Sequence, residues 1–239
     1  MSPNLTFAPR PAARLQYFLW SHPEWWTLAI SGFAWVVMVD HAWQHGGHAI
    51  HHVATFRQEF SGWMWMVAAM MLPQVFYEIR RTADDSLWRR RDRAVVGFLA
   101  GYLGPSLVAG LGAAFLRQRS WTHTLAAPAL AFAAAAAWTL LPGRRRVLIA
   151  CHQRLPLAPT GWRADYDCLR YGVVIGAACL RRCWPLMVAC ALSGHSPVAM
   201  AGGMMVSVVE RRSFRPPKRY AFWGTLGLAG YFAVLAGIG

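Results

Sequence analysis

The chain has 239 residues, of which 56% are hydrophobic and only 14% are charged, whereas a soluble domain carries about 25% charged residues. Long stretches without charge recur along the sequence, which excludes an ordinary soluble domain and predicts an all-α, polytopic membrane helix bundle. The formal net charge of +14 does not indicate nucleic-acid binding, because the basic residues stand in short loops between the apolar stretches.

The apolar stretches predict about seven transmembrane helices. In chain order they cover residues 25–39, 62–79, 94–116, 124–141, 171–192, 197–209 and 220–238. Residues 1–23 then form a cytoplasmic N-terminal segment, and residues 24–239 form a single transmembrane domain. The apolar part of the N-terminal segment is too short for a cleaved signal peptide, so we expect the first span to remain as an anchor.

Basic residues are divided very unequally between the two sides of this predicted bundle. Nineteen of the 24 Lys and Arg residues lie in the N-terminal segment and in the loops after the second, fourth and sixth spans, and three lie in the other loops. The positive-inside rule therefore predicts a cytoplasmic N-terminus and an external C-terminus. Because the arginine and alanine content is typical of a GC-rich bacterium, we expect the bacterial inner membrane, with a His-rich periplasmic segment at residues 40–60.

Five of the nine histidines stand close together in the stretch DHAWQHGGHAIHH, residues 40–52. If the first helix continues past Val39, four of them share one narrow helix face and the fifth lies beside it. Neutral imidazole is the commonest metal ligand, whereas Gly46 and Gly47 weaken a helix here, so a polar interfacial loop is the alternative. The predicted metal ligands of this segment are His41, His45, His48, His52 and, off the face, His51.

Sulfur side chains line one face of the fifth predicted span. Soft sulfur ligands select Cu(I) or zinc over magnesium or calcium, and Pro185 frees a backbone carbonyl and gives ligands room to converge. Simple packing is the alternative, because buried Cys and Met are also good apolar residues. The candidate sulfur ligands are Cys179, Cys183, Met187 and Cys190 on this span, with Met70 and Met71 on the second span.

Two arginines, Arg181 and Arg182, interrupt the same span. A charge at the centre of a bilayer costs about 2.5–3.5 kcal/mol on insertion scales, so both must face protein, water or a lipid headgroup. Asp40, Glu78 and Glu210 are candidate partners. The alternative is a helix that breaks here, with both arginines reaching to the interface.

Several segments stand out as candidate family motifs. They are the histidine cluster ahead of the second span, WMVAAMMLP at 65–73, GFLAGY at 97–102, CHQR at 151–154, GWRAD at 161–165 and RYGVVIGAACLRRCW at 170–184. Together these segments resemble the DUF2182 family of predicted metal-binding integral membrane proteins of bacteria. The resemblance covers about residues 30–238 and implies a multi-span bundle with a copper site and a chaperone-like role. Cys179 and Cys183 match the family's cysteine motif, whereas Arg181 and Arg182 replace its small middle residues.

These observations predict a metal-handling membrane protein, with copper as the expected ion and zinc as the alternative. The periplasmic histidines would capture the ion, and the Cys/Met helix face would hold or relay it. The chain has no P-loop and no long soluble domain that could hydrolyse ATP. We therefore expect delivery to, or assembly of, a membrane or periplasmic metalloprotein.

Two other functions are compatible with the sequence. Short loops and abundant tryptophan are also typical of a structural accessory subunit of a larger membrane complex, whose arginine-rich loops would hold anionic lipid. An intramembrane metalloenzyme would need an open metal position and an acid/base pair. We find no such pair at membrane depth, so we predict no catalytic residues.

Overall fold

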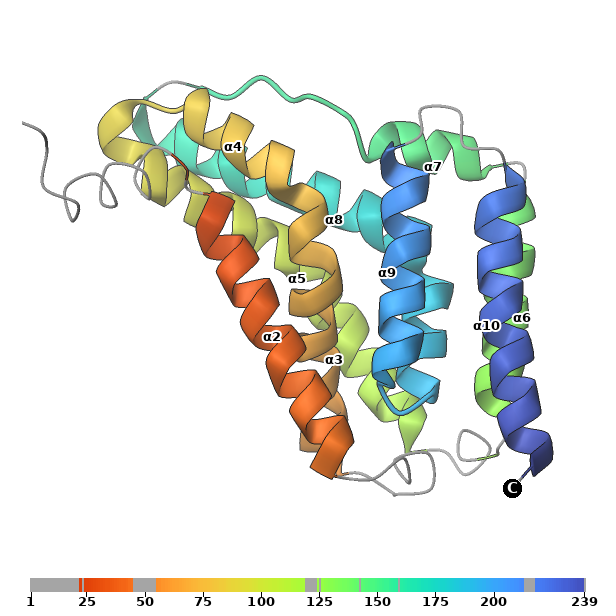
Figure 1. Ribbon diagram of the computed structural model, residues 1–239. Helices are drawn as coiled ribbons and strands as arrows, with labels where there is room; N and C mark the ends of the chain where they lie inside the picture. The colour runs from red at the N-terminus through yellow and green to blue at the C-terminus, as the bar shows by residue number, and fades with distance from the viewer. Residues whose placement is uncertain are drawn as a thin grey trace, which may run out of the picture.

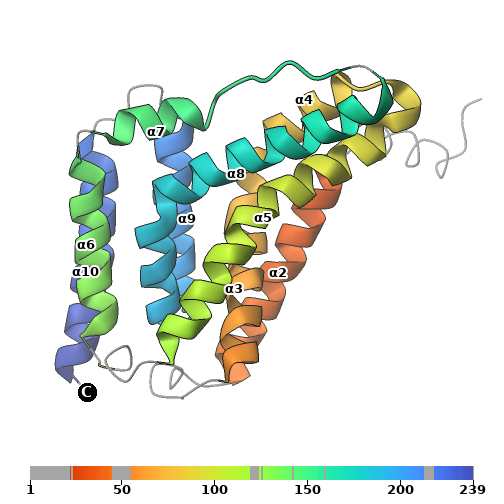
Figure 2. The ribbon, with the colours of Figure 1, turned by 180° about the vertical axis from the view of Figure 1, so that it is seen from behind.

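All regular secondary structure in the described part of the chain is helical. A computed structural model describes residues 22, 24–44, 55–118, 124, 126–141, 143–158, 160–212 and 218–238, and all regular elements in these ranges are helices (Figures 1 and 2). In chain order they are α2 (Glu24–Gln44), α3 (Phe56–Met71), η2 (Leu72–Val75), α4 (Phe76–Asp84), η3 (Trp88–Arg90), α5 (Arg91–Arg117), α6 (Ala127–Leu140), α7 (Arg144–Ala150), α8 (Gly161–Leu192), α9 (Pro197–Arg212) and α10 (Lys218–Ile238). The all-α prediction is confirmed.

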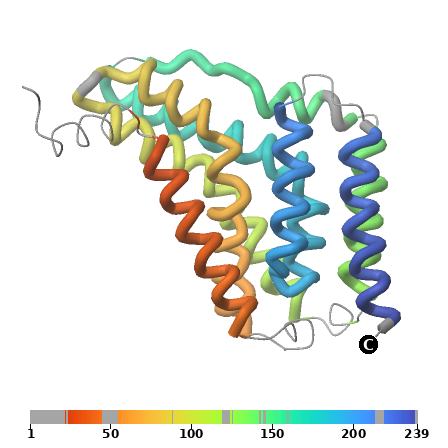
Figure 3. The backbone as a smooth tube through the Cα atoms, viewed as in Figure 1, coloured from red at the N-terminus to blue at the C-terminus, as the bar shows by residue number. Residues whose placement is uncertain are grey.

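Long helices run in alternate directions between two ends of the bundle, with α3, η2 and α4 following one another along a single path (Figures 1 and 3). At one end α8 turns back into α9 at His195, and we call this the His195 end. The opposite end holds α7, the start of α8 and the last turn of α9 (Figure 2). Because most of the basic residues gather there, we call it the arginine end.

All seven predicted apolar stretches contain a helix. Three helices are long and apolar enough to cross a membrane, namely α5, α8 and residues 219–237 of α10, and α6 is a shorter apolar helix. The structure therefore supports a membrane protein, while the count of seven spans and the orientation stay predictions.

Helix α8 starts well before the predicted span. Its 32 residues correspond to about 48 Å, so its polar first turns extend beyond a hydrocarbon core of about 30 Å. Asp165 holds these turns to the start of α5, with ion pairs of 2.6 Å to Arg90 and 2.8 Å to Arg93. The predicted loop 144–170 therefore contains α7 and the beginning of α8.

Glycines let α5 and α8 pack with their backbones in contact. A Cβ atom on Gly101, Gly172 or Gly176 would overlap backbone atoms of the facing helix. Close approach through small residues is how membrane helices gain packing energy without a hydrophobic driving force. These three glycines thus serve packing inside the bundle, and they fix α8 against α5 in one register.

Three further contacts complete the bundle. Helix α6 lies beside α10, where Phe132 and Phe232 stack with ring centroids 5.4 Å apart, and α6 meets α8 through Trp138 and Trp184 at 5.5 Å (Figures 1 and 2). On the other side α2 is held to α3, because the hydroxyl of Ser31 donates to the Ala69 carbonyl at 2.9 Å. The face of α8 that carries the sulfur residues is enclosed between these pairs.

Candidate metal centre

Three sulfur atoms from two separate parts of the chain meet inside the bundle. Cys183 Sγ lies 3.5 Å from Met187 Sδ and 3.7 Å from Met71 Sδ. The exposed fractions of these three residues are only 4%, 2% and 1%. We call Cys183, Met187 and Met71 the sulfur cluster.

Local helical geometry explains how the sulfur cluster forms. Cys183 and Met187 are four residues apart on α8, so their side chains lie on one face. Pro185 stands within α8, which continues through it, and the Cys183 thiol donates to the Cys179 carbonyl at 3.0 Å. Met71 is the last residue of α3, where the following Leu72-Pro73 starts the 3-10 turn η2.

Cys179 lies next to the sulfur cluster and has polar neighbours of its own. It lies one helical turn before Cys183 on α8. The Tyr102 hydroxyl lies 3.5 Å from Cys179 Sγ and 3.2 Å from the Met71 carbonyl oxygen. Arg211 Nη1 lies 3.9 Å from the same sulfur. Helices α5 and α9 therefore each direct a donor at Cys179.

Buried ionic side chains surround these thiols. Arg211 forms an ion pair with Glu78 at 2.5 Å. Arg182, which is 1% exposed, donates to Gln74 Oε1 and also interacts with the charge of Glu210. The alternative in which both arginines reach to the interface is therefore wrong for Arg182.

The other expected partners of these arginines lie elsewhere. Arg181 is exposed on the outer side of α8. Asp40 accepts a hydrogen bond of 2.7 Å from Gln44, one turn later on α2. Glu78 pairs with Arg211 instead of with either arginine of α8. Sequence reasoning named Glu78 and Glu210 as partners but missed Gln74, Tyr102 and Arg211, which reach the site from other helices.

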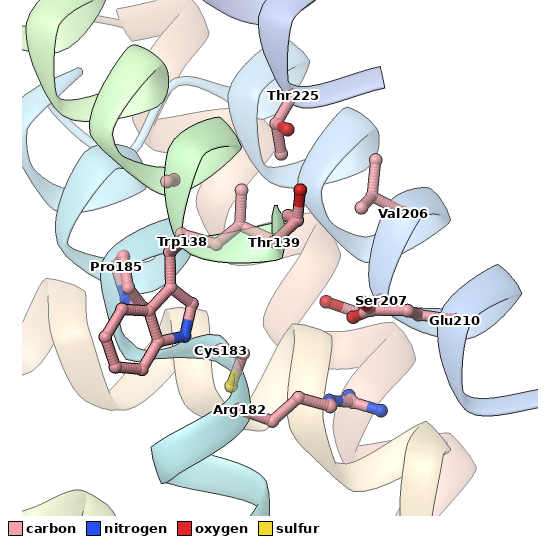
Figure 4. A pocket seen from close by; sticks show the side chains of 11 residues that line it. Trp138, Thr139, Arg182, Cys183, Pro185, Val206, Ser207, Glu210 and Thr225 are labelled. Atoms are coloured by element: carbon pink, nitrogen blue, oxygen red, sulfur yellow. The ribbon is translucent and has the colours of Figure 1, made fainter. Parts of the chain in front are cut away.

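A small cavity with a mixed apolar and polar lining lies beside Cys183. Figure 4 shows Cys183 and Arg182 of α8 facing Ser207 and Glu210 of α9 across it. Its volume of about 10 Å³ corresponds to one water molecule. Cys183 thus has thioethers on one side and a space about the size of one water molecule on the other.

Cys190 and Met70 have contacts that differ from those of the sulfur cluster. Cys190 Sγ is 3.5 Å from the Ala199 carbonyl oxygen. A Cβ atom on Gly203 would lie 3.4 Å from Cys190 Sγ and 3.2 Å from Met70 Cε. Of the predicted sulfur ligands, these two therefore pack around Gly203 of α9, nearer to the His195 end.

Cys151, which follows α7 at the arginine end, is a buried thiol that the prediction did not include. Burial, and then the charge of Cys179, raises the pKa of Cys151 to about 11, and Arg182 and Arg211 act in the opposite direction. Cys151 is thus close enough to Cys179 for the charge of one thiol to affect the other. The only signal in the sequence was its place in the CHQR segment.

The structure describes only one of the five predicted histidine ligands. His41 lies in the last turn of α2, which continues past Val39 to Gln44 as the predicted face requires, and its side chain is exposed. His45, His48, His51 and His52 lie outside the described residues, so their shared face stays a prediction.

His195 occupies the turn between α8 and α9 with a left-handed backbone, φ 57°. A Cβ atom on Gly62 would lie 3.0 Å from its ring, and its Nε2 atom is buried without a hydrogen-bond partner among the described residues. Burial, followed by the charges of Arg117 and His41, lowers the pKa of His195 to about 4. His195 is therefore neutral at physiological pH.

The donor atoms favour a soft ion. Among the residues that the structure describes, no group of three or more His, Cys, Asp and Glu side chains could hold a metal ion. Zinc normally takes four ligands of these kinds, so the zinc alternative gains no support. One thiol with two thioethers is instead a ligand set that suits Cu(I).

Comparison with known proteins agrees with this chemistry. No curated protein and no solved structure matched the chain. A family model described as "PpoB2: Copper chaperone" matches residues 60–234. The match includes the sulfur cluster, Cys179 and Cys151, excludes the segment 40–52, and does not carry the name DUF2182. Because it spans most of the sequence, the chain belongs to the PpoB2 family of copper chaperones.

Proposed function

We propose that the protein binds one Cu(I) ion at the sulfur cluster within the membrane and supplies it to a membrane or periplasmic copper protein. The observation that carries this proposal is the meeting of Cys183 Sγ with two thioether sulfurs at 3.5 and 3.7 Å. Soft thiolate and thioether ligands favour Cu(I) over harder ions.

Charge balance supports a monovalent ion. Binding releases the Cys183 proton, so Cu(I) with one thiolate and two neutral thioethers forms a complex without net charge. The two buried arginines near the site already have acidic neighbours. Glu78 pairs with Arg211, and Glu210 lies within charge interaction of Arg182. A divalent ion at the same ligands would leave an extra positive charge in a buried place, which is unfavourable.

The predicted orientation gives each end of the bundle a role. With the His195 end in the periplasm, the histidines of residues 40–52 would capture copper outside the membrane. The sulfur cluster would then hold it out of contact with water. Capture by His41, His45, His48, His51 and His52 is the part of the proposal that rests on the sequence pattern alone.

Copper affinity of the purified protein tests the proposal. The protein in detergent is titrated under reducing conditions against bicinchoninate, a coloured Cu(I) chelator. We expect one Cu(I) per chain, with binding lost in Cys183→Ser and weakened about tenfold, or about 1.4 kcal/mol, in Met71→Leu and in Met187→Leu.

Met205→Leu is the matched control, because Met205 of α9 is 69% exposed. It should bind copper as the wild type does. A wild-type protein that binds no Cu(I), or a Cys183→Ser variant with unchanged affinity, would contradict the proposal and favour a structural accessory subunit.

A further inference from the structure

Cys179 has surroundings that differ from those of the sulfur cluster. Its sulfur lies 3.5 Å from the Tyr102 hydroxyl and 3.9 Å from Arg211 Nη1, whereas Cys183 Sγ lies against two methionine sulfurs. The two thiols are one helical turn apart on α8, and the Cys183 thiol donates to the Cys179 carbonyl at 3.0 Å. Cys183 therefore lies among thioethers, whereas Cys179 lies among hydrogen-bond donors.

Three helices hold the donors of Cys179 in place. Glu78 of α4 fixes Arg211 of α9 through an ion pair whose side chains are only 12% and 9% exposed. Tyr102 of α5 is fixed at its hydroxyl by the Met71 carbonyl, and its backbone lies against Gly176 of α8. Holding a buried arginine and a buried tyrosine around one sulfur is costly, and apolar packing alone does not require it.

We propose that Cys179 is an exchange thiol, which receives Cu(I) from the sulfur cluster, and that Arg211, Glu78 and Tyr102 are positioning residues for it. This inference rests on the proposed copper site. Copper at the cluster is held by Cys183, Met187 and Met71, and Cys179 is outside this ligand set until exchange occurs. Donors to its sulfur stabilise the thiolate that forms during exchange.

The exchange step conserves atoms, charge and oxidation state. A bond forms between Cu(I) and Cys179 Sγ, and the bond between Cu(I) and Cys183 Sγ breaks. The proton of the Cys179 thiol passes to Cys183 Sγ, which lies one helical turn further along α8. Copper stays Cu(I), no reductant or oxidant is needed, and the same step runs in reverse during loading.

Exchange at Cys179 connects the sulfur cluster with the arginine end of the bundle. Cys179 precedes Cys183 on α8, which starts at that end, and its partner Arg211 stands in the last turn of α9. The buried thiol of Cys151 lies within electrostatic reach of it. Copper at Cys179 thus stays inside the bundle, with a further buried thiol nearby, at a place where a partner protein within the membrane can take it up.

Measuring affinity and transfer rate separately tests the inference. Copper-loaded protein is mixed with bathocuproine disulfonate, a Cu(I) chelator, and the rate of coloured complex formation is followed by stopped flow. In Cys179→Ser, Arg211→Gln and Tyr102→Phe we expect the Cu(I) dissociation constant to stay within about threefold of wild type. The transfer rate should fall about tenfold or more in each, a barrier increase of about 1.4 kcal/mol.

Matched variants separate positioning from folding. Arg212→Gln removes the neighbouring exposed arginine and should transfer copper at the wild-type rate, and Arg211→Lys should recover part of the rate lost in Arg211→Gln. If Arg211→Gln does not fold, Tyr102→Phe and the double variant Glu78→Gln/Arg211→Gln carry the test. X-ray absorption of loaded protein should show three sulfur neighbours around copper in both wild type and Cys179→Ser.

Two results would overturn the inference while leaving the copper site intact. A Cu(I) dissociation constant weakened tenfold in Cys179→Ser would make Cys179 a ligand of the resting site, and an unchanged transfer rate would make it a packing residue. A wild-type protein without copper would instead overturn the proposed function, and this inference with it.

Discussion

Gly176 packs so closely against the backbone of Tyr102 that a Cβ atom at this glycine would overlap the Tyr102 carbonyl. This contact sets the distance between α5 and α8 one helical turn away from Cys179. The Tyr102 hydroxyl can lie 3.5 Å from Cys179 Sγ only because the two backbones touch. The close contact between Gly176 and the Tyr102 backbone therefore helps to determine the geometry of the candidate site.

Substitution in this interface should destabilise the protein. Gly101→Ala places a methyl group onto the Leu169 carbonyl of α8, and such overpacking costs about 1–3 kcal/mol. A lowered midpoint of thermal unfolding in detergent would show it. Gly112→Ala on the same helix meets no atom within 4 Å and should be neutral or stabilising. Equal midpoints for the two variants would contradict the close packing.

The ion pair between Arg117 and Glu59 near the His195 end should be important for stability. Its side chains are 4% and 7% exposed, and removing one partner of a buried pair costs about 3–5 kcal/mol. Glu59→Gln should therefore strongly lower the unfolding midpoint. Asp85→Asn breaks the exposed pair with Arg81 and should cost less than about 1 kcal/mol. Comparable losses in both variants would show that burial does not set the energy of the pair.

His195 should make stability fall in mildly acidic solution. Its pKa of about 4 in the folded protein lies below its ordinary value of 6.5, so between these values the unfolded chain binds a proton that the folded protein does not. Stability therefore decreases as the pH falls from 6.5 to 4 and levels off below, by at most about 3–4 kcal/mol. Thermal unfolding across this range measures the effect.

His195→Asn should flatten this part of the pH profile, since asparagine tolerates the left-handed backbone and does not titrate. The exposed His152→Asn provides the control. A profile that is the same in wild type and in His195→Asn would assign the acid sensitivity to other groups.

Cysteine labelling should report the burial of Cys151. A pKa of about 11 leaves roughly a hundredfold less thiolate at pH 8 than an ordinary cysteine has. Native protein should therefore gain no maleimide adduct within minutes, as all five cysteines are buried. Unfolded protein should gain five by intact mass, and Cys151→Ser should gain four. A fast native adduct that disappears in Cys151→Ser would show that this thiol is accessible.

Much of the fold could be predicted from the sequence, because apolar length and the absence of charge determine helices in a membrane protein directly. The boundaries that were missed lie where charges pair locally. Asp165 with Arg90 and Arg93 extends α8 beyond the apolar stretch, and no hydrophobic pattern signals such pairs. The length of α8 was therefore underestimated.

The candidate site could be predicted only along one helix. Periodicity correctly placed Cys179, Cys183 and Met187 on one face of α8, since residues three and four apart are neighbours there. It could not show that Met71 contacts Cys183 while Met70 turns to Gly203. The contact between Tyr102 and Cys179 likewise joins residues 77 positions apart, and such distances in sequence carry no local signal.

Met71, Gln74 and Glu78 lie on one short stretch that passes from α3 through η2 into α4. The first contacts Cys183, the second holds Arg182, and the third holds Arg211. Inserting a single residue after Gln74 would rotate Glu78 by about 100° about the helix axis and separate the metal ligand from the ion pair. This stretch should therefore tolerate a change of side chain far better than a change of length.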